Sequence, residues 1–134
     1  MIIPTDQKNN FYLEKQKRVD NKDFTLEFPN GGIEKGEEKL EAARRELSEE
    51  LGLEGDMVYL GEFHPFDILV KLTVSVFICR NVREQEEINK LRPDFYEKIK
   101  MEKFTKQEIY NLIKQGKIKH SYFLSALTLY NSQS

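Results

Sequence analysis

The sequence predicts an α/β layered domain, and two observations support this fold class. Stretches in which apolar and polar residues alternate, as in β-strands, are mixed with three stretches in which apolar residues recur every three or four positions, as in helices. The chain of 134 residues is long enough for one domain and short for two ordinary ones. We therefore expect residues 1–134 to form a single domain.

The strand candidates are recognised by alternation and by the turn residues that bound them. Residues 6–10 read as a turn after an extended start, and residues 11–13 open a second extended piece. Residues 24–28 alternate and stop at Pro29. Further strands are expected over 57–66, 69–79 and 98–104, with a long polar loop over 81–96.

The helix candidates are expected over residues 38–51, 106–115 and 121–130. The first has one apolar stripe formed by Leu40, Ala43, Leu47 and Leu51. Gly52 follows it and supplies a C-terminal stop. The second begins behind Thr105, a suitable N-cap residue, with Glu108 at the spacing of a capping box.

Composition excludes several classes of partner. Lys and Arg number 21 against 23 Asp and Glu, so no overall positive charge attracts long nucleic acid. No apolar run is long enough for a signal peptide or a membrane span, so we expect no membrane association. The single cysteine, Cys79, cannot form an internal disulfide, and we expect a cytoplasmic protein.

A cluster of charged residues lies in the first predicted helix. Glu46, Glu49 and Glu50 occupy positions i, i+3 and i+4, so their carboxylates leave one side of the helix, and Arg45 is one turn from Glu49. Like charges at this spacing repel, and a hard divalent cation such as Mg²⁺ removes the repulsion. Taken alone, the same residues also fit a solvated helix face with a surface ion pair.

The spacing over residues 31–53 is more specific. It reads Gly31, five residues, Glu37, seven residues, and then Arg45-Glu46-Leu47-Ser48-Glu49-Glu50-Leu51-Gly52-Leu53. This matches every specified position of G-x5-E-x7-R-E-U-x-E-E-x-G-U, where U is apolar, and the chain therefore resembles the Nudix hydrolase family. The resemblance implies an α/β/α sandwich around a mixed β-sheet, with the signature forming a loop-helix-loop.

The resemblance also implies roles for these residues. Glu46, Glu49 and Glu50 would bind Mg²⁺, with Mn²⁺ as a substitute, helped by a backbone carbonyl at Gly31 or Gly32. Arg45 would orient a glutamate, and Glu37 would brace the loop or reach the metal through water. In some members the general base belongs to the signature, so Glu49 and Glu50 are catalytic candidates together with Arg45. In ADP-ribose pyrophosphatases the base lies on a later loop, which makes Glu97 the candidate here, with Glu84, Glu86 and Glu87 as alternatives.

Residues outside the signature resemble the ADP-ribose pyrophosphatase subgroup. Gln16-Lys17-Arg18 is similar to its Q-x-R, and the run from Glu27 to Glu34 is similar to its E-x-P-x-G-x-x-E. The resemblance implies substrate binding by Arg18, Glu27 and Gly32, although Arg18 also fits a surface arginine at a strand end. The chain departs from the subgroup after Pro65, where Phe66-Asp67-Ile68 replaces a glycine and a glutamate.

The expected function is Mg²⁺-dependent hydrolysis of the diphosphate linkage of a nucleoside diphosphate derivative. ADP-ribose or a nucleotide sugar would give a nucleoside monophosphate and a sugar phosphate. One alternative is a pyrophosphohydrolase of nucleoside triphosphates or dinucleoside polyphosphates. Another is a catalytically silent module that binds a nucleotide or a protein. The expected partner is a small nucleoside diphosphate compound, and the family makes a homodimer plausible.

Overall fold

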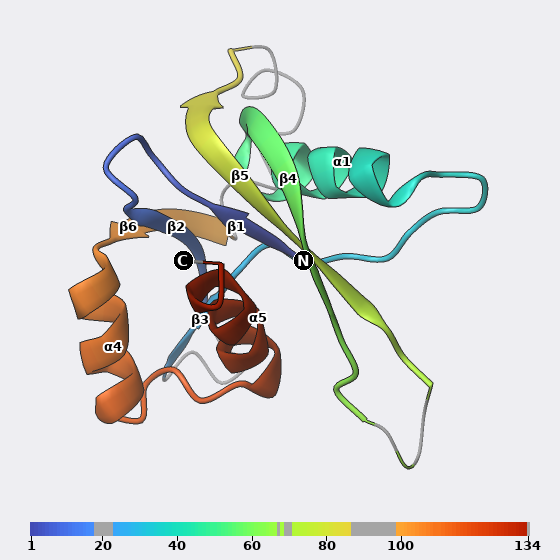
Figure 1. Ribbon diagram of the computed structural model, residues 1–134. Helices are drawn as coiled ribbons and strands as arrows, with labels where there is room; N and C mark the ends of the chain where they lie inside the picture. The colour runs from blue at the N-terminus through green and yellow to red at the C-terminus, as the bar shows by residue number, and fades with distance from the viewer. Residues whose placement is uncertain (18–22, 67, 69–70, 87–98, 134) are drawn as a thin grey trace.

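The computed structural model describes residues 1–17, 23–66, 68, 71–86 and 99–133 (Figure 1). Its elements, in chain order, are β1 (Ile2–Pro4), β2 (Phe11–Lys17), β3 (Phe24–Glu27), α1 (Lys39–Leu51), β4 (Leu53–Phe63), β5 (Val74–Glu84), β6 (Ile99–Phe104), α4 (Lys106–Lys114) and α5 (Ser121–Asn131). No helix in these ranges is long and apolar enough to span a membrane.

The strands form two sheets of three. In the first, β1 is parallel to β5 and β4 is antiparallel to β5, so the pairing is mixed. In the second, β3 and β6 both pair antiparallel with β2. The predicted α/β class is confirmed, with the strands divided between these two sheets.

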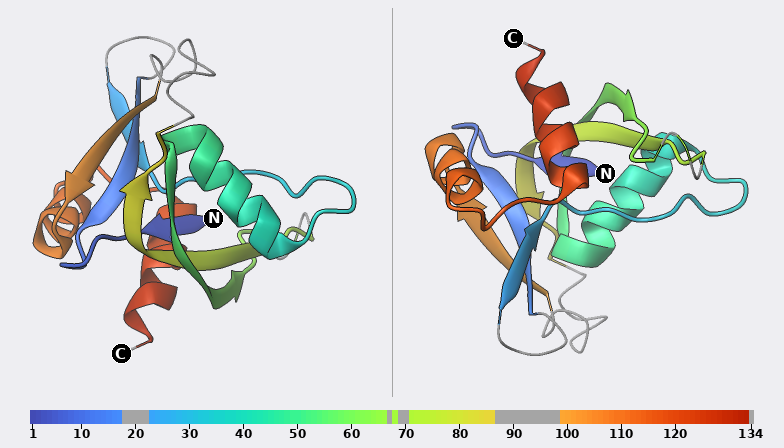
Figure 2. Two further views of the ribbon diagram at one scale, coloured as in Figure 1. Left: turned by 90° about the horizontal axis from the view of Figure 1, so that it is seen from above. Right: turned by 90° about the horizontal axis from the view of Figure 1, so that it is seen from below.

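Helices cover both faces of the mixed sheet, with α1 on one side and α5 on the other (Figure 2). Neighbouring residues on one strand therefore enter different cores. Ile2 and Phe77 pack with the buried side of α1, whereas Ile3 and Val76 pack with α4 and α5. This alternation follows from strand geometry, in which successive side chains point to opposite faces. The result is a sandwich of helix, sheet and helix.

Aromatic packing fixes α5 against the segment that precedes α1. The rings of Phe28 and Phe123 stack with centroids 4.2 Å apart, and both side chains are buried. Phe28 directly follows β3, so this stack holds the start of the glycine-containing loop beneath α5. The backbone N–H of Ile2 donates to the carbonyl of Pro29 at 2.9 Å and fixes the same loop to β1.

The strand limits differ from the prediction on both sides of the β4–β5 hairpin. β4 begins at Leu53, directly after α1, and Leu53 pairs with Glu84. Residues 81–84, predicted as loop, therefore belong to β5. Pairing irregularities near Gly55 and Gly61, and a left-handed Asn81 (φ 55°), interrupt the alternation that the prediction relied on.

The helix limits were predicted correctly where residues at the helix ends determine them. α1 ends at Gly52 in the left-handed conformation (φ 64°), as predicted. The Thr105 hydroxyl accepts from the N–H of Glu108, and the Glu108 carboxylate accepts from the N–H of Thr105, which confirms the capping box. Leu40, expected in the buried stripe, is 36% exposed. Ala42 takes its place, so the buried residues of α1 are Ala42, Ala43, Leu47 and Leu51.

Candidate active site

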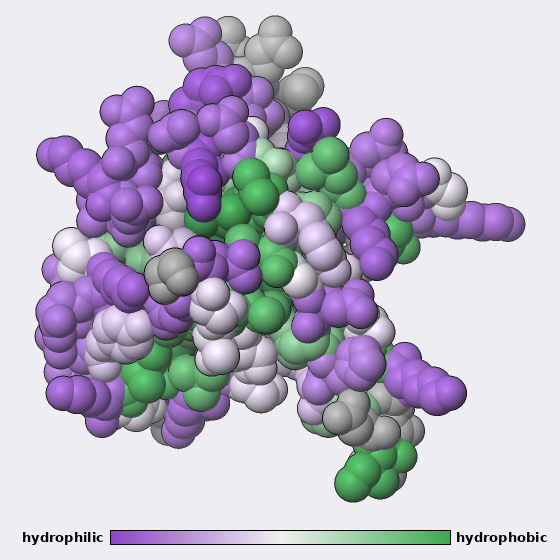
Figure 3. All heavy atoms as spheres, in the orientation of Figure 1, coloured by the Kyte–Doolittle hydropathy of each residue, from purple (hydrophilic) through white to green (hydrophobic). Residues whose placement is uncertain are grey.

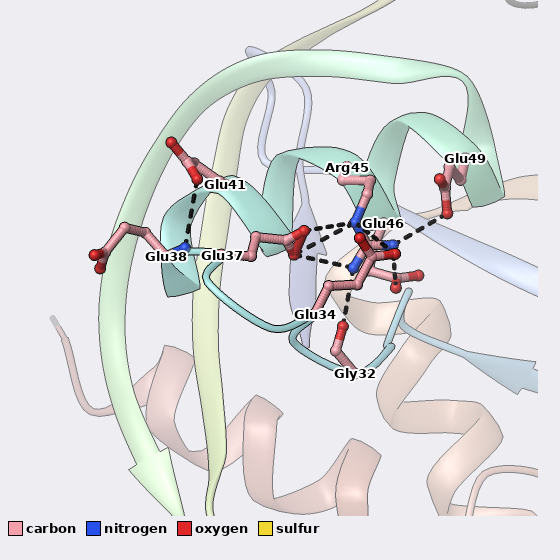
Figure 4. Close-up of polar contacts among 8 residues, drawn as sticks. All are labelled: Gly32, Glu34, Glu37, Glu38, Glu41, Arg45, Glu46 and Glu49. Carbon is pink, nitrogen blue, oxygen red and sulfur yellow. Dashed lines mark hydrogen bonds and ion pairs between the residues drawn. The ribbon is translucent and has the colours of Figure 1, made fainter.

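Arg45 is the centre of a polar network in the signature (Figure 4). Its guanidinium donates to both carboxylate oxygens of Glu37, at 2.8 and 3.0 Å. It also donates to Glu46 at 2.8 Å, to Glu49 at 3.2 Å and to the carbonyl of Gly32 at 2.9 Å. One side chain on α1 thus fixes two acids of its own helix and two points on the preceding loop.

The electrostatic effect of this network is mutual. Hydrogen bonds from Arg45 hold the pKa of the Glu37 carboxyl below its usual range. The carboxylates in turn keep the pKa of Arg45 above its ordinary value, mainly through the hydrogen bonds to Glu37. Arg45 and Glu37 therefore remain charged at neutral pH, and the loop is tied to the helix by charge-assisted hydrogen bonds.

Gly31 lies directly over the Glu46 carboxyl group. A methyl group at Gly31 would meet the Glu46 carboxyl carbon at 2.0 Å, whereas one at Gly32 would meet nothing within 4 Å. Only a residue without a side chain allows the loop backbone and this carboxylate to approach so closely. The two adjacent glycines therefore have different structural roles.

Glu50 contacts the loop at a different point, next to Asn30. Its carboxylate accepts from the backbone N–H of Asn30 at 3.1 Å. It also lies against the carboxyl group of Glu14, which reaches it from β2. Burial, followed by the negative charge of Glu46, raises the pKa of Glu50, although its contacts with Glu14 and Asn30 act in the opposite direction. The environment of Glu50 thus differs from that of Glu46 and Glu49.

Glu14 was not singled out from the sequence, yet it is the most perturbed acid near the signature. It is only 3% exposed, and Gln16 donates to its Oε2 at 3.3 Å. Among the described residues no donor reaches its Oε1. Burial, then the contact with Glu50 and the charge of Glu27 across the strand pair, raise its pKa to about 10. Its sequence gives little warning, since a glutamate in an alternating strand ordinarily faces solvent.

The structure places the other predicted site residues in four different ways. Arg45, Glu46, Glu49, Glu37 and Gly32 are in direct contact. Glu27 lies on β3 with its carboxylate 4.0 Å from the Nε2 of His120. Arg18 and Glu97, together with the alternative base Glu87, lie outside the described residues. Glu84 and Glu86 are described, at and beyond the end of β5.

The acids do not form a closed metal shell in the described ranges. No three acidic, histidine or cysteine side chains there are already arranged to hold an ion. The reason is visible in the network, because Arg45 holds Glu46 and Glu49 while Glu50 is turned toward Asn30 and Glu14. For all three glutamates to bind one ion, the side chains of Glu46 and Glu49 would have to rotate.

A cavity of about 450 Å³ adjoins the signature loop. Its lining includes Gly31, Gly32, Glu46, Lys39, Phe77 and Tyr122. In the space-filling view a notch separates the loop before α1 from the β4–β5 hairpin (Figure 3). A smaller cavity of about 230 Å³ shares Asn30 and Tyr122 with it and adds Glu27 and His120. Space for a small molecule thus lies beside the carboxylates.

Comparison with known proteins identifies the family. The family description "NUDIX domain" matches residues 1–127, and the chain belongs to the Nudix family. It is a Nudix pyrophosphohydrolase, an enzyme class that acts on small nucleotide compounds and generally uses a divalent metal. A solved structure described as the crystal structure of an ADP compounds hydrolase has the same fold, with a TM-score of 0.81 and 22% identity. That alignment covers 99% of this chain and 70% of the other. No curated protein sequence matches the chain.

The residues present fit a divalent cation. Carboxylate and carbonyl oxygens are the donors that Mg²⁺ and Mn²⁺ accept. Glu14 and Glu50 are carboxyl groups in contact, and among the described residues neither forms an ion pair with a cationic side chain. A cation placed between them would supply the missing positive charge.

Proposed function

We propose that this enzyme hydrolyses the diphosphate linkage of ADP-ribose or a nucleotide sugar with the help of Mg²⁺. The observation that carries the proposal is the junction of the signature acids with an adjacent cavity. Glu46 lies at this junction, because it contacts Arg45 and also lines the cavity. A diphosphate bound over the acids could therefore extend its remaining moiety into that space.

Each residue has a separate part in the proposed reaction. Glu46, Glu49, Glu50 and the carbonyl of Gly31 would hold the cation, for which Mn²⁺ could substitute. Bound there, the cation would act as a Lewis acid on the diphosphate and lower the pKa of a coordinated water. Arg45 would orient a glutamate of the signature. Arg18, Glu27 and Gly32 would contact the substrate.

A carboxylate must accept the proton of the attacking water. Glu49 and Glu50 are candidates because they belong to the signature. Glu97 is the candidate from the later part of the chain. Glu97→Gln should slow the chemical step and leave metal affinity nearly unchanged, which single-turnover kinetics and a Mn²⁺ titration can separate. Unchanged turnover would direct the search for the base to the signature helix.

Two arguments favour a nucleoside diphosphate sugar among the possible substrates. The residues that resemble the ADP-ribose pyrophosphatase subgroup flank the signature, and the fold matches that of an ADP compounds hydrolase. A cavity of about 450 Å³ is also within the size range of small-molecule sites. A nucleoside triphosphate has no second sugar for such a space.

The test is a hydrolysis panel with and without Mg²⁺. It contains ADP-ribose, nucleotide sugars, dinucleoside polyphosphates and nucleoside triphosphates, and the products are separated by chromatography. Mg²⁺-dependent release of a nucleoside monophosphate and a sugar phosphate is expected for the first two groups. Release of pyrophosphate from triphosphates would contradict the proposed substrate class. Silence of a folded, Mg²⁺-binding protein across the panel would contradict the activity and favour a binding module.

A further inference from the structure

We propose that Glu14 on β2 is a ligand of the divalent cation, so that the metal site extends from the signature helix onto the second sheet. The inference rests on the proposed function, since it concerns the cation that the signature acids would hold. Glu14 lies outside the 31–53 signature, and its contact with Glu50 joins β2 to the last turn of α1.

The geometry of the Glu14 carboxyl group carries the argument. The side chain is almost fully buried, at 3% exposure, and it is directed at Glu50 instead of at solvent. Its Oε2 accepts one hydrogen bond, from Gln16 at 3.3 Å. Its Oε1 meets no donor among the described residues. A buried carboxylate oxygen without a partner is costly, so such an oxygen ordinarily marks a missing proton, water or ion.

The neighbours of Glu14 point to an ion. The charged groups that act on Glu14 are the carboxylates of Glu50 on α1 and of Glu27, its cross-strand partner on β3. The adjacent Lys15 does not compensate them, because its ammonium lies 3.2 Å from Glu102 on β6. Three carboxyl groups from three elements thus approach one another without an ion pair to any of the described lysine or arginine side chains.

Arg45 cannot supply the missing charge. Its five donors are directed to Glu37, Glu46, Glu49 and the Gly32 carbonyl, and none of them reaches Glu14 or Glu50. A divalent cation between Glu14 and Glu50 would be contacted by hard oxygen ligands from both sheet and helix. Hard oxygens are the ligands that Mg²⁺ and Mn²⁺ prefer.

The test is a Mn²⁺ titration of the whole chain by isothermal calorimetry, with free Mn²⁺ followed by electron paramagnetic resonance. Glu14→Gln keeps the shape of the side chain, and replaces the ionisable carboxyl group with a neutral amide that is a poor metal ligand. We expect its Mn²⁺ affinity to fall about tenfold or more, the range usual when a group supporting a metal site is lost. Glu54→Gln is the matched control, since it removes an equal charge from an exposed position on β4, where Glu54 pairs with Arg83 and not with a neighbour of Glu14. Its Mn²⁺ affinity should equal that of the wild type.

A second variant covers the case in which Glu14→Gln fails to fold. Glu14→Asp retains the charge and withdraws it by one methylene, so its affinity should lie between those of the wild type and Glu14→Gln. Wild-type affinity in a folded Glu14→Gln or Glu14→Asp would overturn the inference and leave the proposed function intact. A wild-type protein that binds no Mn²⁺ and hydrolyses nothing would overturn both.

Discussion

The acids around α1 form two groups that differ in what neutralises them. Glu37, Glu46 and Glu49 contact Arg45, and the hydrogen bonds of that arginine lower the pKa of Glu37. Glu14 and Glu50 contact each other, and their pKa values are raised chiefly by burial. The first group is neutralised by Arg45. Among the described residues no lysine or arginine pairs with the second group, and burial lowers the pKa of the Met1 ammonium near Glu50 to about 6. We therefore expect a bound cation to be stabilised more beside Glu14 and Glu50 than beside the acids that contact Arg45.

The largest expected effect is on turnover. Glu49→Gln removes a charged candidate ligand from the Arg45 group, and we expect the kcat to fall by about two orders of magnitude or more while the fold persists. Steady-state kinetics together with circular dichroism provide the measurement. Glu41→Gln, an equal charge change in the first turn of the same helix, is the control and should retain activity. Near-full activity of Glu49→Gln would remove Glu49 from the metal site.

The glycine pair tests whether the position of the Glu46 carboxylate matters. In Gly31→Ala the new methyl group meets the end of the Glu46 side chain, which can rotate away, so the protein should fold. We expect roughly a tenfold loss of kcat/KM, because the carboxylate leaves its place beside the loop. Gly32→Ala has open space and should behave as wild type in the same assay. Equal activities in both variants would mean that the close approach serves only packing.

A smaller effect is expected on the stability of the Arg45 group. Arg45→Gln leaves Glu37, Glu46 and Glu49 without their shared cation, and like charges then repel along the loop and helix. The melting temperature of the metal-free protein should fall, as measured by calorimetry in the presence of a chelator. Arg44→Gln, at the exposed neighbouring position, is the control. A melting temperature that stays constant would show that solvent screens the network completely.

The smallest effect is a pH dependence of stability in the Glu14 group. The folded-state pKa of Glu14, about 10, exceeds the ordinary value of 4.5, so the folded protein holds this proton more tightly than the unfolded chain. The resulting stabilisation is complete below pH 4.5 and is lost as the pH rises toward 10. Metal-free wild type should therefore lose stability relative to Glu14→Gln between pH 6 and pH 9, the range set by these pKa values.

Denaturant unfolding across that pH range measures this difference. Glu27, Glu46, Glu50 and the buried Met1 amino group, whose pKa is lowered to about 6, are present in both proteins, so their direct contributions largely cancel in the comparison. Parallel pH profiles for the two proteins would mean that Glu14 titrates as an ordinary exposed acid.

Features decided by local chemistry were predictable from the sequence. The end of α1 at Gly52 and the Thr105 capping box depend on residues a few positions apart, and both were confirmed. The spacing of Arg45 and Glu49 likewise predicted their contact, because a helix places such residues one turn apart.

Features decided by distant contacts were not predictable. Bulges in the β4–β5 pairing hid the true strand limits, since they break the alternation that marks a strand. The contact between Glu14 and Glu50 joins a strand of one sheet to the helix that covers the other, and no spacing along the chain encodes it. The sequence analysis therefore identified the acids that contact Arg45, but it did not identify Glu14, the buried partner of Glu50.

The short strand β1 has a consequence for how the molecule loses its structure. Its neighbouring isoleucines, Ile2 and Ile3, are almost completely buried in different cores, one beneath α1 and the other beneath α4 and α5. One peptide bond joins these two residues, so disorder in either core would also displace the isoleucine that packs in the other core. The two apolar layers are thus coupled into one cooperative unit, and thermal melting should remove both in a single transition.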